Sequence, residues 1–335
     1  MATTEFEKAL RRVSDLSGPL DTMALFGLSN ARRGDVALFG EHWPTIPVER
    51  RREIMADLGA LSAESFEVEF TPLFRVALDD TDAEVRAKAI ENLWEDDDPV
   101  LAPRYVSLLG HDDSPAVRGA AANALGKYMY LAEMEELDPK LAADIRQALL
   151  ESVRNPLEIT DVRRYAVESL AFLGDDEVRG VIEDAYNTSS EQMQASAMRG
   201  MGRSLDPYWS GLVLMELSNA DPRIRQEAIW ASGELELKQA VPTLVDMLEE
   251  PNRDLLIGVI QSLGRIGGPI ARQALELVAE SEDEEIAEEA EDALSELLFN
   301  EGEDWLEYEF NATALAEPDD SGMEDLDLTW DYDED

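Results

Sequence analysis

The same pattern of apolar residues recurs along the chain at intervals of about 31 residues, and this periodicity limits the possible folds more than any other feature. In the segment that starts at Val117, apolar residues occupy positions 0, 3, 4, 7 and 8, the pattern of an amphipathic helix. The same frame starts again at six other residues, which are Val85, Val162, Met193, Ile224, Leu255 and Ile286. Successive starts are 32, 45, 31, 31, 31 and 31 residues apart, so the sequence predicts a helical repeat protein.

A second amphipathic helix is predicted in front of most of these segments. Six of the starting residues have an apolar residue eleven positions earlier, namely Phe74, Val106, Ile182, Val213, Leu244 and Leu275. The intervening turns contain Asp, Asn, Ser and Pro, which suit the first turn of a helix. Each repeat is therefore predicted to be a helical hairpin. A degenerate first hairpin around Phe39 and Arg50 brings the number to about eight.

The hairpins divide the chain into three predicted parts. Residues 1–28 are expected to form an N-terminal capping helix and a linker, and residues 29–300 the repeat array. Residues 301–335 contain 15 acidic residues and no Lys or Arg, so we expect an acidic tail that is mostly disordered. The step of 45 residues indicates an insertion of about fourteen residues that is shared between two sites, at 128–139 and at 154–160.

The frame apolar-Arg-x-x-Ala-x-x-Ala-Leu-Gly, which residues Val117 to Gly126 show in full, resembles HEAT repeats. The 31-residue period is similar to the short HEAT-like repeats of the phycobilisome lyase class. This resemblance implies an all-α protein, a right-handed α-solenoid of about eight HEAT-like hairpins followed by the disordered acidic tail. It also implies a non-catalytic scaffold or adaptor that binds a protein or peptide on its concave face. The alternative is a bilin-lyase-like chaperone or enzyme subunit that cradles a tetrapyrrole.

Composition excludes several other classes of function. The formal net charge of -46 repels phosphate backbones and anionic membranes, so neither nucleic acid nor membrane is an expected partner. The chain has no Cys, and neither His42 nor His111 is followed by Glu, as it would be in the iron-binding pairs of deoxyhypusine hydroxylase. We therefore predict no catalytic residue, metal site or cofactor. The sequence shows no signal peptide and no long apolar segment, which predicts a cytoplasmic protein.

A candidate partner-binding site emerges from positions 6 and 10 of the repeats, which are expected to face the concave surface. The central repeats place large aromatic residues and arginines there, namely Phe172, Arg199, Arg203, Trp230 and Arg265. This composition is typical of binding hot spots. In the alternative interpretation, the aromatic rings fill gaps between repeats, and Glu168 and Glu234 neutralise the arginines. Arginines at position 1 are expected to pair with carboxylates in the turns; they are Arg86, Arg118, Arg163 and Arg225.

The acidic tail has two aromatic residues near its end, Trp330 and Tyr332. Such rings can stack on guanidinium groups while neighbouring carboxylates pair with arginines. This favours the hypothesis that the tail docks intramolecularly on the concave face when no partner is bound. The alternative is a solubilising or partner-seeking extension.

Overall fold

The computed structural model describes residues 3–315 of the chain, with side chains described up to residue 299. All regular elements in this range are helices: α1 Thr4–Val13, α2 Thr22–Leu25, α3 Arg33–His42, α4 Val48–Glu64, α5 Thr71–Ala77, α6 Ala83–Asn92, α7 Ala102–His111, α8 Pro115–Ala124, α9 Gly126–Glu133, α10 Pro139–Arg154, α11 Thr160–Leu170, α12 Asp176–Tyr186, α13 Glu191–Arg203, α14 Ser210–Glu216, α15 Pro222–Glu234, α16 Val241–Asp246, α17 Arg253–Ile266, α18 Pro269–Val278 and α19 Glu284–Leu315.

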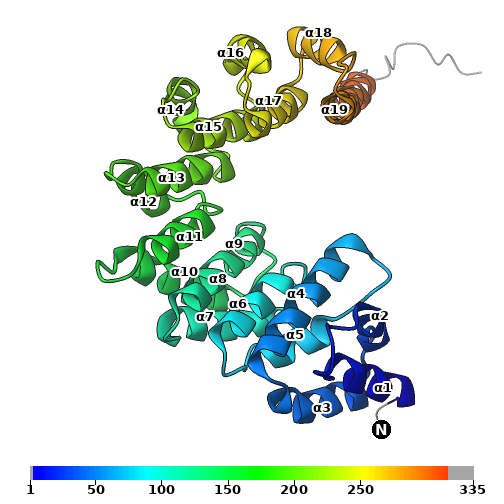
Figure 1. The fold of residues 1–335 in the computed structure, drawn as a ribbon. Helices are drawn as coiled ribbons and strands as arrows, with labels where there is room; N and C mark the ends of the chain where they lie inside the picture. Colours follow the sequence, from blue (N-terminus) through cyan, green and yellow to red (C-terminus); the bar gives the residue numbers. More distant parts are fainter. Residues whose placement is uncertain (1–2, 316–335) are drawn as a thin grey trace, which may run out of the picture.

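The helices of the described range form eight hairpins, as the repeat predicted. The pairs are α3–α4, α5–α6, α7–α8, α10–α11, α12–α13, α14–α15, α16–α17 and α18–α19. The later helix of each pair, called the second helix below, contacts the second helix of the next hairpin from α4 through to α19. The hairpins therefore stack into a curved α-solenoid whose second helices line the inner side of the curve (Figure 1).

The residues of the repeat frame explain how the hairpins form. The seven starting residues of the frame are all buried in the core. Turn residues begin the second helices: the Asp82 side chain accepts a hydrogen bond from the Val85 N–H, and the Asn252 side chain from the Asp254 and Leu255 N–H groups. The periodic apolar stripe thus supplies the core, and the polar turn sets where each second helix starts.

Neighbouring second helices approach one another closely at position 9, which is glycine in five of the repeats. A Cβ atom added to Gly264 would lie 2.8 Å from the carbonyl oxygen of Ala293 on α19. One added to Gly233 would lie 3.1 Å from the Cα atom of Ser262 on α17. Equivalent contacts join Gly126 to Ser169 and Gly202 to Ala231. In these repeats glycine is favoured at position 9 because the next helix occupies the space of a side chain.

The long step in the repeat comes from the first of the two predicted insertion sites. Helix α8 is followed at once by α9, and α10 is longer than the first helices of the later hairpins. The connection from α10 to α11 at residues 155–159 is short, so the second site contributes little. Helix α9 contacts α10 and α11 and is thus packed into the array.

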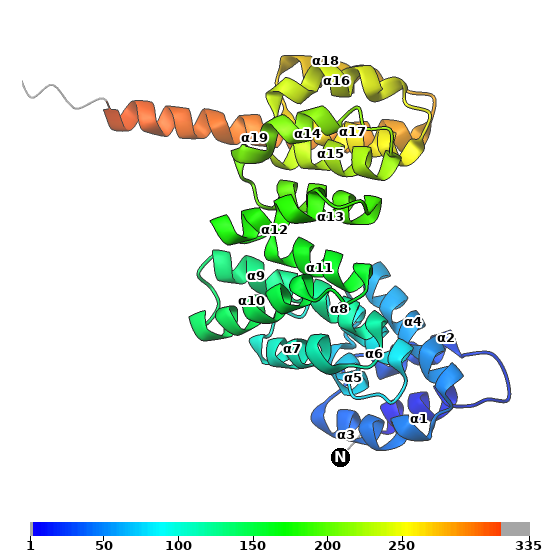
Figure 2. The ribbon, with the colours of Figure 1, turned by 90° about the vertical axis from the view of Figure 1, so that its left-hand side faces the viewer.

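The two ends of the array differ from its middle. At the N-terminus, α1 buries Phe6, Leu10 and Val13 and contacts α2 and α3. At the other end, α19 continues to Leu315 and projects beyond the neighbouring helices (Figure 2). The predicted boundary at residue 300 falls inside this helix. Residues 316–335, including Trp330 and Tyr332, lie outside the described residues.

The turn after each of three second helices uses a residue with positive φ, and these residues are spaced by 31: Leu205 (φ 51°), Glu236 (φ 47°) and Gly267 (φ 66°). Only the last is glycine, which adopts this conformation without steric cost.

We expect Glu236→Gly to raise the free energy of unfolding by about 0.5–1 kcal/mol, because glycine relieves the strain of a positive φ. Urea unfolding followed by circular dichroism measures this change. The matched control is Gln226→Gly in the exposed interior of α15, which should destabilise by roughly 0.5 kcal/mol. Destabilisation by both variants would contradict the explanation.

Candidate functional site: the inner face

Polar side chains connect neighbouring second helices along the inner face, the surface that these helices present to the inside of the curve. A residue at position 6 of one helix bonds to position 3 of the next: Arg199 Nε lies 2.8 Å from a Glu227 carboxylate oxygen. In the same way, the Gln261 amide donates to Glu289 at 2.6 Å, and the Ser196 hydroxyl to Glu168 at 2.5 Å. These contacts form a polar row that joins α11 to α13, α13 to α15 and α17 to α19, while Trp230 and Gly258 occupy the same positions of α15 and α17.

The structure brings most of the predicted partner-binding residues together in two stacked pairs. The Arg199 guanidinium lies over the Trp230 ring at 4.7 Å from its centroid, and that of Arg203 lies over Phe172 at 5.1 Å. Phe172 also makes an edge contact with Tyr130. Arg265 is on α17, where it pairs with Glu234 and lies 3.8 Å from Glu296. The five residues therefore lie along one face, as their positions in the repeat predicted.

Neighbouring carboxylates engage the arginines of this cluster. Arg203 donates to the carbonyl oxygen of Glu168 at 3.0 Å and is 3.7 Å from its carboxylate. Burial lowers the pKa of Arg203, and burial raises the pKa of Glu227, which Arg199 opposes. The side chains of Arg199 and Arg265 keep 34% and 36% of their surface exposed, compared with 20% for Arg203. Arg199 and Arg265 are thus the arginines of the cluster most accessible to a partner.

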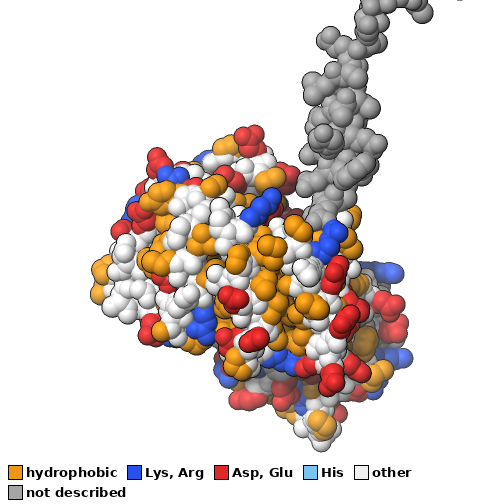
Figure 3. Space-filling model, turned by 90° about the horizontal axis from the view of Figure 1, so that it is seen from above, with side chains coloured by type: hydrophobic (Ala, Val, Ile, Leu, Met, Phe, Trp, Pro, Cys, Tyr) orange, Lys and Arg blue, Asp and Glu red, His pale blue; other side chains and the backbone are white. Residues whose placement is uncertain are grey.

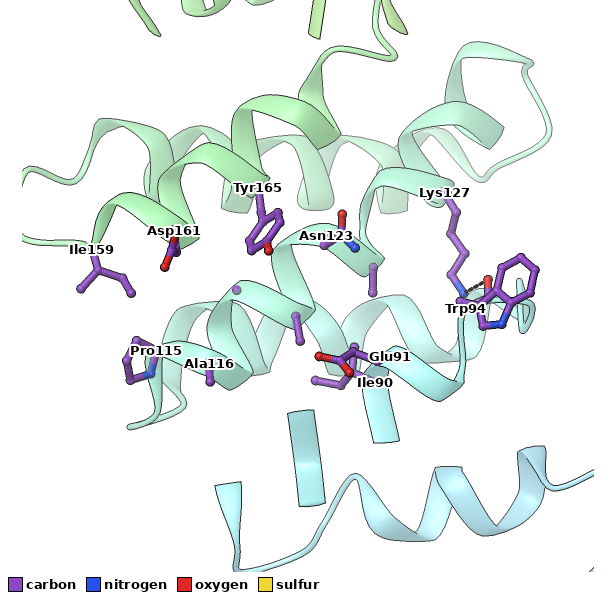
Figure 4. A pocket seen from close by; sticks show the side chains of 13 residues that line it. Ile90, Glu91, Trp94, Pro115, Ala116, Asn123, Lys127, Ile159, Asp161 and Tyr165 are labelled. Atoms are coloured by element: carbon purple, nitrogen blue, oxygen red, sulfur yellow. Dashed lines mark hydrogen bonds between the residues drawn. The ribbon is translucent and has the colours of Figure 1, made fainter. Parts of the chain in front are cut away.

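A groove of about 520 Å³ opens on the inner face along α8, between α6 and α11 (Figure 4). Its floor is made of small residues of α8, and larger apolar side chains border it. The floor includes Ala116, Gly119, Ala120 and Ala124, and the border includes Ile90, Trp94, Ile159 and Tyr165. Pro115 and Ile159 lie at one end, and Trp94 and Lys127 lie at the other.

The groove exists because two features of the repeat are interrupted at α6 and α8. Position 3 of α8 is Ala120, which has no polar group to meet Glu91 at position 6 of α6. Position 9 of this repeat is Trp94, where the other interior hairpins have glycine or alanine. Helix α6 ends at Asn92, and the Trp94 side chain remains 68% exposed. The small side chains of α8 and the displaced tryptophan leave the inner face open at this point.

Lys127 supports the turn that carries Trp94. Its ammonium donates to the carbonyl oxygens of Leu93 at 2.7 Å, Trp94 at 3.2 Å and Asp96 at 2.6 Å. Burial lowers the pKa of Lys127, while Asp96 and Asp97 raise it. These three bonds cap carbonyl groups at the end of α6, so the lysine acts mainly as an internal brace.

The sequence prediction missed the groove. It placed Glu91, Asn123 and Lys127 on the concave face by position but selected the aromatic and arginine residues of later repeats. The available signal was Trp94 itself, a tryptophan at the position that carries glycine in five other repeats.

The predicted arginine ladder is present in a modified form. Arg86 makes a bidentate ion pair with Asp112 in the next turn, as expected. Arg118 instead pairs with Glu158, across the α10–α11 connection. Arg163 and Arg225 donate to the carbonyl oxygens of Val153 and Asn219. Three of the four therefore tie a second helix to a turn, and Arg163 ties α11 to the last turn of α10; only Arg86 and Arg118 pair with carboxylates.

Apolar side chains also reach the surface over the C-terminal hairpins (Figure 3). Met215 on α14 and Ile270 and Leu277 on α18 are each more than half exposed. Their helices are the first helices of their hairpins, so they offer positions away from the inner face for control substitutions.

Within residues 3–299, no group of three or more His, Asp or Glu side chains is placed to hold a metal ion. No helix of the described range is long and apolar enough to cross a membrane.

The family model for HEAT repeats matches residues 71–158 and 212–295, together more than half of the chain. No curated protein matches the chain in sequence. Solved structures with similar architecture include human deoxyhypusine hydroxylase, with 20% identity over 84% of this chain and 100% of that chain and a TM-score of 0.34. The CpcE–CpcF complex of phycocyanin lyase from Nostoc has 18% identity over 57% of this chain and 74% of that chain, with a TM-score of 0.39. Importin beta has 13% identity over 88% of this chain and 46% of that chain, with a TM-score of 0.42.

Proposed function

The chain belongs to the family of HEAT-repeat proteins, and on this basis we propose that it is a non-catalytic scaffold or adaptor whose inner face binds a protein partner. HEAT-repeat solenoids generally serve protein interaction. The observation that supports the proposal lies between α6, α8 and α11, where the inner face opens into an apolar groove with an exposed tryptophan. Exposed aromatic side chains in a preformed groove are typical anchors for a protein partner.

The partner-binding surface in this proposal extends beyond the groove to the residues predicted from the sequence. Arg199, Trp230 and Arg265 lie farther along the same face and are partly exposed. Phe172 and Arg203 are packed more tightly and support the positions of their neighbours. A long inner face with separate anchor points suits an extended segment or a subunit surface.

Affinity capture from the source cells tests the proposal. We expect the wild-type chain to retain a partner that Trp230→Ala with Arg265→Ala retains at least tenfold less, because the contact area on the inner face is reduced. The control, Met215→Ala with Leu277→Ala on first helices, should capture as the wild type does. Melting curves of both variants check that the array is folded. Equal capture by a folded inner-face variant would contradict the proposal.

Intramolecular docking of the acidic tail through Trp330 and Tyr332 stays a prediction. The arginines with which the tail would pair, Arg199, Arg203 and Arg265, already contact Glu227, Glu168 and Glu234. Carboxylates of the tail would therefore have to replace these glutamates. A chain shortened by residues 318–335 belongs in the same capture experiment. Greater capture by the shortened chain is the result expected if the tail covers the inner face.

The tetrapyrrole-cradling alternative also stays a prediction. The structural likeness to phycocyanin lyase concerns the repeat architecture only. A shifted visible absorbance band after mixing with an open-chain tetrapyrrole would favour this alternative over a protein-binding scaffold.

A further inference from the structure

We propose that the groove along α8 binds a segment of a partner protein that is apolar in the middle and has Lys or Arg at both ends. This inference rests on the proposed function, because it assigns one part of the inner face to one chemical class of ligand. It is carried by the shape of the groove, the exposure of its apolar border and the charges at its two ends.

The apolar part of the groove can accept several side chains in a row. Trp94 is 68% exposed and Ile159 is 43% exposed, so both side chains are accessible to a segment bound in the groove. From Pro115 to Lys127 the groove follows α8 and α9 for about 18 Å at 1.5 Å per residue. That length matches about five residues of an extended chain or three turns of a helix.

The turns next to both ends of the groove carry exposed acidic residues. Glu95 and Asp97 lie in the turn that carries Trp94, and Asp113 lies in the turn before Pro115. Each of these three carboxylates is exposed, and none makes an ion pair within the described part of the chain. A segment with basic ends would place opposite charges at both turns.

The basic residues near the groove do not cancel this acidic character. Lys88 pairs with Glu91 on the rim, and Arg164 pairs with Asp161. The Lys127 ammonium is held by three carbonyl oxygens. Lys127 therefore keeps its positive charge, and the three exposed carboxylates Glu95, Asp97 and Asp113 outnumber it, so the net charge of these unpaired groups is negative.

The same charges argue against the chain's own tail as the ligand. Residues 301–335 contain 15 acidic residues and no Lys or Arg. Like charges at both ends of the groove would repel such a segment. The groove and the arginine cluster of later repeats thus differ in the partner chemistry that they favour.

A peptide selection on the full-length chain tests the inference. Random 14-residue peptides are displayed on phage and selected on the wild-type protein. We expect enrichment of peptides with aliphatic or aromatic residues between Lys or Arg residues. The best peptide is then synthesised with a fluorescent label, and its affinity is measured by anisotropy at low and high salt. Its affinity should fall as the salt concentration rises, since exposed charges at the ends of the groove contribute to binding.

Two substitutions test whether the selected peptide occupies the groove. Trp94→Ala removes the exposed anchor, and Ala120→Arg places a large side chain on the groove floor and fills the groove. Each should weaken binding at least tenfold, while Met215→Ala on α14 should leave it unchanged. If Ala120→Arg does not fold, Ala116→Arg can be used instead to fill the groove. Trp94 and Ala116 are exposed, so substitutions there leave the buried core intact.

Three results would overturn the inference: no enrichment over the bare support, enrichment of acidic peptides, or equal affinity for the wild type and the folded groove variants. Such results would leave the proposed function standing if Trp230→Ala with Arg265→Ala still lost the captured partner. Loss of the groove site and loss of the whole inner face are therefore distinguishable.

Discussion

Replacing Gly264 by valine is expected to destabilise the protein by about 3 kcal/mol, because the new side chain meets the backbone of the next helix. Its Cβ atom would lie 2.8 Å from the carbonyl oxygen and 3.1 Å from the Cα atom of Ala293. A carbonyl oxygen and a Cα atom in the middle of α19 cannot move aside as a flexible side chain can. The second helices α17 and α19 would have to separate, which removes buried contacts at the end of the array.

A second glycine in the same helix provides the control for this prediction. A Cβ atom at Gly258 would have only the Ile229 Cγ2 atom nearby, at 3.7 Å. Gly258→Ala should therefore stabilise the protein by about 0.5–1 kcal/mol through helix propensity alone. Urea unfolding followed by circular dichroism at 222 nm measures both. Similar effects of the two substitutions would show that position 9 is not a point of close approach.

Replacing Ala228 by aspartate is expected to destabilise the protein by about 4 kcal/mol, since it buries a carboxylate without a partner. Ala228 is fully buried at position 4 of α15, in the middle of the array. Each hairpin contacts only its neighbours, so a defect in a central hairpin weakens two interfaces. We expect a lower melting temperature and, at elevated temperature, partial unfolding that starts in the central repeats.

An exposed acidic residue on the last second helix is the matched control. Glu288 is exposed on α19, and Glu288→Ala should change the stability by no more than about 0.5 kcal/mol. Melting shifts of the same size in Ala228→Asp and Glu288→Ala would contradict the assignment of buried and exposed positions in the repeat.

The helical hairpins could be predicted from the sequence because the buried apolar residues recur at the same positions of each repeat. An apolar residue at position 0 and another eleven residues earlier recur often enough to place both helices of most units. The seven starting residues are all buried, and the predicted first hairpin around Phe39 and Arg50 is α3–α4. Local periodicity is sufficient for these features, since each hairpin packs against near copies of itself.

The groove and the ion pairs were harder to predict because they depend on residues that are far apart in sequence. Position alone placed Arg199 on the inner face, but its partner Glu227 is 28 residues away. Arg118 pairs with Glu158 because the longer step in the repeat moves the next turn. Trp94 cannot pack between second helices at position 9 because these helices lie close together there, and the sequence alone does not show this distance.

The central claim, that a partner binds on the inner face at the groove, is tested most directly by site-specific photo-crosslinking. A photoreactive amino acid is placed at Ala116 inside the groove and, as a control, at Ile270 on α18; both positions are exposed. Crosslinking in the source cells, followed by mass spectrometry, identifies the peptide in contact. We predict a partner peptide with an apolar centre and flanking Lys or Arg at position 116, and none at position 270. The same adducts at both positions, or adducts at position 270 alone, would contradict the claim.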